Sequence, residues 1–318
     1  MLHLRMRVPS DLTDQVAELL DDDPTVVNVA VLPHAYRKPD GCLVLADVTR
    51  ESAQTLLSRL HTLGVARTGA IAIDDDETIL SDAATQAEKA APGRPEDGVV
   101  WDILEDNARS DSEISFAFIV FLTLATLIAS VGRLQDQPIL IVGAMVVGPE
   151  FAPVAAICLA LARPRLSILP TACSTLFGGY VIATVIASII WTVVYRAGGF
   201  AAGQLAHRPL TDFIVQPNVW SLVIALIAGC AGTLSLTTDK SATLVGVFIS
   251  VTTIPAIGTL ALAAATLDKS NALASLVQLG VNISGMIVAG TLTLLLERIL
   301  WSRISAVRPR GRRRPSLL

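Results

Sequence analysis

The pattern of hydrophobic and polar positions changes near residue 115. Before it, short runs alternate apolar and polar residues, as in half-buried strands, or repeat them every three to four residues, as in amphipathic helices. After it, apolar runs follow one another, each close to or above the ~20 residues that a membrane-spanning helix needs. The chain therefore predicts a small α+β domain followed by an all-α polytopic membrane domain.

The first region, residues 1–75, predicts strands and helices in the order βαββαβ. Strands are expected at Leu2–Val8, Val26–Leu32, Cys42–Val48 and Gly69–Ile73, and helices after Pro9 and over Thr49–Leu63. This order is that of a cytoplasmic ferredoxin-like domain. Its expected core residues are Leu4, Leu19, Val29, Leu45, Leu57 and Ile71. Such a domain either binds a small ligand or partner, or serves only as an assembly platform.

The segments around the membrane domain have polar or amphipathic compositions. Residues 76–98 are acidic and rich in alanine, glycine and proline, which predicts a flexible linker. Residues 99–114 predict an amphipathic helix at the membrane interface. Residues 303–318 form a basic tail whose clustered arginines are expected to stay in the cytoplasm. An even number of spans then places both termini on the cytoplasmic side of the cell membrane.

Residues 115–302 predict a transmembrane domain of about six spans. The expected spans are Ser115–Val131, Pro138–Ala162, Ser167–Tyr195, Asn218–Thr238, Ser241–Leu267 and Leu273–Leu300. The second contains Gly148-Pro149-Glu150-Phe151-Ala152-Pro153, where two prolines disfavour a helix around a carboxylate. We expect this span to be non-helical over Gly148–Pro153, with Glu150 turned away from lipid toward a polar cavity or another helix.

Two stretches of the membrane domain can be superposed as an internal repeat. Asp136–Pro153 and Asp239–Pro255 each begin with an aspartate, have a glycine seven residues later, and end with a proline deep in the span. Three spans separate the copies, so they would run in opposite directions. The pattern indicates an inverted 3+3 repeat with interrupted helices, a plan that recurs in secondary transporters.

The residues of the second span also resemble a known family. The segment Gly143-Ala144-Met145 followed by Pro149 and Pro153 is similar to a motif of bacterial and archaeal hydrophobic proteins, domain of unknown function number 389. The resemblance extends over Val99–Leu296 and implies a multi-spanning membrane domain without implying a substrate. The family often has an apolar residue where this chain has Glu150, and a double proline where it has Ile254-Pro255.

Polar residues inside the spans are the candidates for function. Glu150 could bind a proton or cation, or it could be a carboxyl group hydrogen-bonded to a neighbouring helix. The hydroxyl groups of Thr252 and Thr253 are expected to bond the carbonyls that Pro255 frees. The candidate substrate or ion site comprises Glu150, Gly148, Pro149, Pro153, Pro255, Asn282 and Gln278. Asp136 and Asp239 either line an entrance or are solvated residues at the span ends.

Composition and missing motifs narrow the class of protein. The chain of 318 residues is 52% hydrophobic and 16% charged, with a mean hydropathy of +0.60, which predicts an integral membrane protein in contact with a lipid bilayer. It contains no phosphate-binding GxxxxGK[ST] loop, no HExxH and no GxSxG, and its four histidines and four cysteines are scattered. We therefore expect no enzyme activity, no cofactor, no metal site and no nucleic-acid partner.

Two functions remain. The interrupted spans and Glu150 favour a secondary transporter or channel for a small solute or ion. The alternative is a membrane-anchored sensor or scaffold whose ferredoxin-like domain binds a small ligand or partner. Small residues such as Gly178, Gly179 and Gly285 permit close helix packing, and a homo-oligomer is expected.

Overall fold

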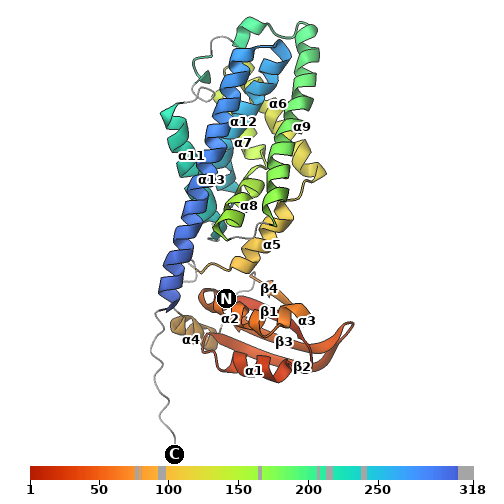
Figure 1. The fold of residues 1–318 in the computed structure, drawn as a ribbon, viewed down its shortest axis with the longest axis vertical. Coiled ribbons are helices and arrows are strands. Elements are labelled where there is room, and N and C mark those ends of the chain that lie inside the picture. Colours follow the sequence, from red (N-terminus) through yellow and green to blue (C-terminus); the bar gives the residue numbers. More distant parts are fainter. Residues whose placement is uncertain are drawn as a thin grey trace, which may run out of the picture. The chain divides into compact units, whose positions relative to one another are not determined.

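A computed structural model describes residues 1–75, 79, 81–91, 98–163, 167–205, 208–212, 218–237 and 242–306. The chain divides into two compact units, one formed mainly by Met1–Leu104 and the other by Glu105–Glu297 (Figure 1). The boundary lies inside helix α5, ten residues before the first long apolar run begins at residue 115.

The N-terminal unit contains a four-stranded antiparallel sheet. Its elements are β1 (Leu2–Val8), α1 (Thr13–Asp21), β2 (Val26–Arg37), β3 (Asp40–Val48), α2 (Arg50–Thr62), α3 (Val65–Thr68) and β4 (Ala70–Asp74). The strand order in the sheet is β2-β3-β1-β4, and every neighbouring pair is antiparallel. Apart from the one-turn helix α3, the order of elements along the chain is the predicted one.

The core of this unit lies on one face of the sheet. The even-numbered residues of β1, from Leu2 to Val8, are fully buried, and residues of both α1 and α2 pack in the same cluster. Among the predicted core residues, Leu4 and Leu57 are buried, and three are partly buried against the cluster: Leu19, Val29 and Ile71.

The prediction for Leu45 is wrong. Its neighbours Val44 and Ala46 are the buried residues of β3, and Leu45 pairs with Arg5 on the opposite face of the sheet. Apolar residues occupy both phases of this strand, so alternation along β3 could not identify the inner face. The pairing of Met6 with Val44 decides it, because a shift of one residue would reverse every side chain.

Two helices follow the sheet domain, α4 (Asp82–Ala90) and α5 (Trp101–Asp111). The described part of the predicted linker is therefore helical over α4, whose Ala84 and Ala87 are buried. Val100 and Ile103, expected on a helix along the membrane surface, instead belong to the core of the N-terminal unit. Their apolar side chains find burial in protein, which corrects the interfacial assignment for this end of α5.

The second unit is a bundle of apolar helices. They are α6 (Phe116–Leu134), α7 (Pro138–Val147), α8 (Phe151–Ala162), α9 (Leu169–Arg196), α11 (Val219–Thr237), α12 (Ala242–Thr266) and α13 (Lys269–Ala306), with a 3₁₀ turn, η2, at Ala202–Leu205. Among the described residues, α6, α9, α11 and α13 are long and apolar enough to cross a membrane, and the bent pair α7–α8 makes a fifth candidate. The fifth predicted span, Ser241–Leu267, corresponds to α12 and stays a prediction, because among the described residues only Thr253–Thr266 counts as an apolar helix there, and it is short.

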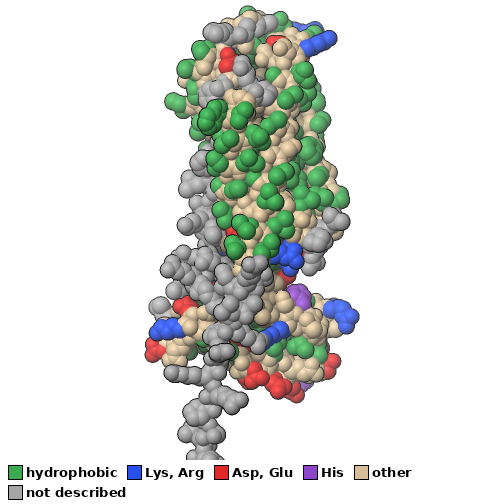
Figure 2. Space-filling view, turned by 60° about the vertical axis from the view of Figure 1, so that its left-hand side comes forward, with side chains coloured by type: hydrophobic (Ala, Val, Ile, Leu, Met, Phe, Trp, Pro, Cys, Tyr) green, Lys and Arg blue, Asp and Glu red, His purple; other side chains and the backbone are tan. Residues whose placement is uncertain are grey.

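The outer surface of the bundle is apolar. Large hydrophobic side chains such as Ile139, Val181 and Leu292 are more than 60% exposed. Figure 2 shows hydrophobic side chains spread over the visible face of the bundle, with few charged ones among them. A soluble protein rarely exposes so many large apolar side chains except at an interface. The surface and the helix lengths together indicate a membrane protein.

Helix α12 lies in the interior of the bundle. It packs against α6, α7, α9 and α11 (Figure 1). Its backbone approaches α6 closely, since a Cβ on Gly258 would lie 2.9 Å from the Cβ of Ala129, and the Ser130 hydroxyl donates to the Gly258 carbonyl at 2.9 Å. This helix can therefore present side chains to several neighbours at once.

The second predicted interruption is wrong, because α12 runs through Pro255 as one helix. A single proline removes one backbone donor and bends a helix, but it leaves the hydrogen bonds on either side in place. The α7–α8 break differs, since it combines a glycine with two prolines four residues apart.

Candidate functional site

The break between α7 and α8 is three residues long. Gly148 ends α7 with an extended backbone, at φ −67° and ψ 125°, and α8 begins at Phe151. Pro149 lacks an N–H, so it cannot continue the hydrogen-bonding of α7. Pro153 lies in the first turn of α8, where a missing N–H is tolerated. The break is thus shorter than the predicted stretch Gly148–Pro153, and the two helices meet at 60°.

Glu150, the last residue of the break, points into the bundle. It is fully buried, and its Oε1 accepts a hydrogen bond of 2.8 Å from the hydroxyl of Thr253 in α12. The carboxyl group also lies against Gly148, where a Cβ would collide with Oε2 and would stand 3.0 Å from Cγ1 and Cδ1 of Ile254. As expected, the side chain faces another helix instead of lipid. Thr253, which was expected to bond a backbone carbonyl, bonds this carboxyl group.

Tyr180 of α9 is a third member of the site. Its side chain is buried, and its hydroxyl lies beside Thr253 and within electrostatic reach of Glu150. The hydroxyl oxygen makes no hydrogen bond of normal geometry with the described residues. We did not predict Tyr180 as a site residue, although its position near the middle of a long apolar helix was a usable signal, since membrane tyrosines gather at the interfaces.

The other predicted site residues fall into separate places. Pro255 is buried in α12, two residues after Thr253 and so close to the break. Gln278 and Asn282 are buried on one face of α13, where the Gln278 Nε2 donates to the Asn282 Oδ1 at 3.5 Å. Asp239 lies outside the described residues, as does the side chain of Thr252.

Asp136 belongs to a polar network at one end of the bundle. Its Oδ1 accepts from the Thr211 hydroxyl at 2.8 Å and its Oδ2 from the Leu210 amide at 3.3 Å. Arg133, only 3% exposed, donates to Thr211 at 2.9 Å and to Asp212 at 2.6 Å. Asp136 therefore ties the loop at residues 208–212 to the turn between α6 and α7, a structural role that neither sequence interpretation included.

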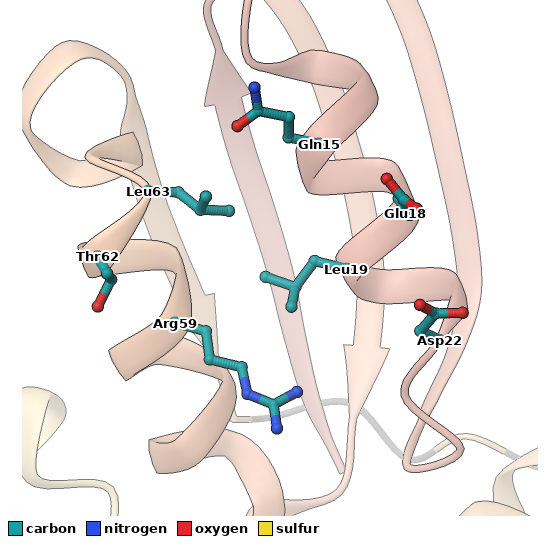
Figure 3. A pocket seen from close by; sticks show the side chains of 7 residues that line it. All are labelled: Gln15, Glu18, Leu19, Asp22, Arg59, Thr62 and Leu63. Atoms are coloured by element: carbon teal, nitrogen blue, oxygen red, sulfur yellow. The ribbon is translucent and has the colours of Figure 1, made fainter.

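The N-terminal unit has an open groove between α1 and α2 (Figure 3). Its volume is about 410 Å³, and it is lined by Gln15, Glu18, Leu19, Asp22, Arg59, Thr62 and Leu63. Leu19 and Leu63 point toward each other across the groove, and Arg59 reaches from α2 toward α1. Such a groove could hold a small molecule with an apolar body and a charged group.

The parts of the chain that the structure describes contain no cluster of metal-binding side chains. Within them, no three histidine, cysteine, aspartate or glutamate side chains gather closely enough to hold a metal ion. What the bundle does offer is a buried carboxyl group from the α7–α8 break and hydroxyl groups from α9 and α12. These groups can accept or donate protons and can supply oxygen ligands to a cation.

Comparisons with known proteins agree with the resemblance in the second span. The family model described as "Domain of unknown function (DUF389)" matches residues 145–288, which include Glu150, Tyr180 and Thr253. An uncharacterised protein of Methanocaldococcus jannaschii is 28% identical over 170 residues, which are 54% of this chain and 49% of that protein. The chain thus matches about half the length of this relative. No solved structure matches the chain. Over residues 145–288, the membrane unit is similar to the DUF389 family, as its Gly-Ala-Met and proline pattern predicted.

Proposed function

We propose that the membrane unit is a secondary transporter or channel for a small solute or ion, with its site at the α7–α8 break. The observation that carries this proposal is the buried hydrogen bond between Glu150 and Thr253 beside interrupted backbone. An acidic side chain deep in a membrane helix costs about 2.5–3.5 kcal/mol on insertion scales, and broken backbone adds to that cost. Helix interruptions in transporters often mark the binding site.

The groups at the site favour a positively charged substrate or coupling ion. Glu150 supplies carboxylate oxygens, and the hydroxyl oxygens of Thr253 and Tyr180 can coordinate a cation or relay a proton. The protonated carboxyl would instead donate a hydrogen bond and remain neutral. Alternation between these two states is the chemistry that proton- or cation-linked transport requires.

Flux measurements on Glu150→Gln test this function. The amide keeps the size of the side chain and an acceptor for Thr253, but it cannot ionise. In proteoliposomes with an entrapped pH dye and Na⁺ or K⁺ gradients, we expect this variant to lose proton- or cation-dependent flux while it elutes as the wild type does. Glu113→Gln, at an exposed carboxyl group before α6, is the matched control. Wild-type flux and pH dependence in Glu150→Gln would contradict the proposal.

We also assign the N-terminal unit to the ferredoxin-like class. The order of its elements and the sheet order β2-β3-β1-β4 support this assignment. A sensor or scaffold remains the second candidate function, and the α1–α2 groove favours it. A thermal-shift screen of small metabolites, repeated with Arg59→Ala and Leu63→Asp, tests it. Stabilisation by a compound in the wild type but not in these variants is the expected result. A compound that stabilises all three equally would exclude the groove.

The orientation in the membrane and the oligomeric state complete the proposed function. We place the protein in the cell membrane with both termini in the cytoplasm, because the arginine-rich tail of the sequence follows the last span. We expect a closed homo-oligomer. Labelling of single cysteines from either side of the membrane tests the orientation, and mass measurement in nanodiscs tests assembly. A monomer in nanodiscs would contradict the second expectation.

A further inference from the structure

One face of α13 carries polar side chains into the bundle. Ser275, Gln278 and Asn282 follow one another at helical spacing and are at most 1% exposed. The residues between them, Leu276 and Val277, are 52% and 46% exposed and face outward. Over residues 275–282 the helix thus has an apolar exposed face and polar side chains on its buried face, the reverse of the arrangement in a soluble bundle.

Two polar atoms on this face and one on α12 have no protein partner in the described part of the chain. The Gln278 Oε1 and the Ser275 Oγ make no hydrogen bond, nor does the buried Thr259 Oγ1 of α12. A buried polar group without a partner costs about 1–3 kcal/mol. Such atoms are normally satisfied by ordered water or a polar ligand. Three such atoms in one bundle therefore indicate that water or a polar ligand reaches them.

The hairpin of α12 and α13 places these groups at matching depths. Only Leu267 and Asp268 separate the helices, and the Asp268 amide donates to the Ala263 carbonyl at 2.8 Å. Helices joined by so short a connection run in opposite directions, so residues equally distant from the turn lie at about the same depth.

By this count, Ser275 is level with Thr259, within one residue. Asn282, fourteen residues after Asp268, is level with Thr253, fourteen residues before Leu267. Thr253 bonds Glu150. The polar groups therefore extend from near the α12–α13 turn down to the depth of the buried carboxyl group.

We propose that Ser275, Gln278 and Asn282 line a water-containing pathway from the α12–α13 turn to Glu150, and that this pathway takes small cations. The sign of the charge follows from the chemistry of these groups, because the Gln278 amide oxygen only accepts, the Ser275 and Thr259 hydroxyl oxygens can accept, and the Glu150 carboxyl group at the end of the pathway is negative when ionised. The role of this pathway rests on the proposed transport function, but the presence of water in it can be measured without transport.

Cysteine accessibility tests the pathway. The four native cysteines are first replaced by alanine, and elution of this background as the wild type is confirmed. Ser275→Cys and Gln278→Cys are then compared with Leu276→Cys and Val277→Cys in nanodiscs, using a cationic methanethiosulfonate reagent. We expect the first pair to react at least about tenfold faster, because the reactive thiolate forms only where water is present. An anionic reagent of similar size should react more slowly at the same two positions.

Equal rates at all four positions would overturn the pathway, and faster reaction with the anionic reagent would overturn the assignment to cations. If the cysteine-free chain does not fold, hydroxyl-radical labelling of native Gln278 against Val277 gives the same comparison. Reactive cysteines without any flux would leave the pathway standing and refute the transporter. Flux together with unreactive cysteines would refute the pathway and leave the transporter standing.

Discussion

The close contact of Gly148 with Glu150 gives a sharp test of the site. Gly148 has φ −67° and ψ 125°, a conformation that alanine adopts without strain. The only effect of Gly148→Ala is therefore the volume of the added methyl group. That methyl would collide with the Glu150 carboxyl group and stand 3.0 Å from two side-chain carbons of Ile254.

The expected cost can be worked from these neighbours. Ile254 is fully buried in α12 and cannot move far, so overpacking against it costs about 1–3 kcal/mol. The carboxyl group can swing away, but this breaks its hydrogen bond to Thr253, which adds about 1 kcal/mol. We expect Gly148→Ala to lower the free energy of unfolding by about 2–4 kcal/mol in total.

Denaturant titration in mixed micelles measures this change. Gly143→Ala in the same helix is the matched control, since a Cβ there meets nothing within 4 Å. Glu150→Ala removes one of the two colliding groups, so the double variant should recover part of the loss in a double-mutant cycle. Equal stability of the two glycine variants, or additive effects of Gly148→Ala and Glu150→Ala, would refute the packing described at the break.

Three further predictions concern buried polar groups. Burial raises the pKa of Glu51 above its ordinary value, so between the two pKa values the folded chain binds more protons than the unfolded chain, and stability falls as pH rises. Glu51→Gln should remove that fall and raise the free energy of unfolding near neutral pH by about 1 kcal/mol. Unfolding measured at acidic and at neutral pH tests this. Asp212→Ala leaves the buried Arg133 with Thr211 as its hydrogen-bonded side-chain partner and should cost about 2–3 kcal/mol, with Asp212→Glu as the partial rescue. Thr253→Val should impair flux while Thr253→Ser retains it, because only the serine keeps a donor to the carboxyl group; equal flux in both would remove this hydrogen bond from the mechanism.

Local pattern predicted most of the elements because it acts within a few residues. Strand β1 has the predicted bounds Leu2–Val8, and the helix expected at Thr49–Leu63 is α2 with one cap residue at each end. The break between α7 and α8 was also predictable, since a glycine and two prolines four residues apart disfavour a helix there wherever the segment lies. These outcomes require no knowledge of distant parts of the chain.

Tertiary structure decided which groups meet. The inner face of β3, and so the exposure of Leu45, depends on the pairing with β1, because both phases of that strand are apolar. The partner of Glu150 is Thr253, 103 residues away, and Tyr180 reaches the same place from a third helix. Periodicity can show that a side chain faces inward, but not which helix lies opposite. That choice depends on how the helices pack around α12, where contacts between residues far apart in sequence set the neighbours of each buried polar group.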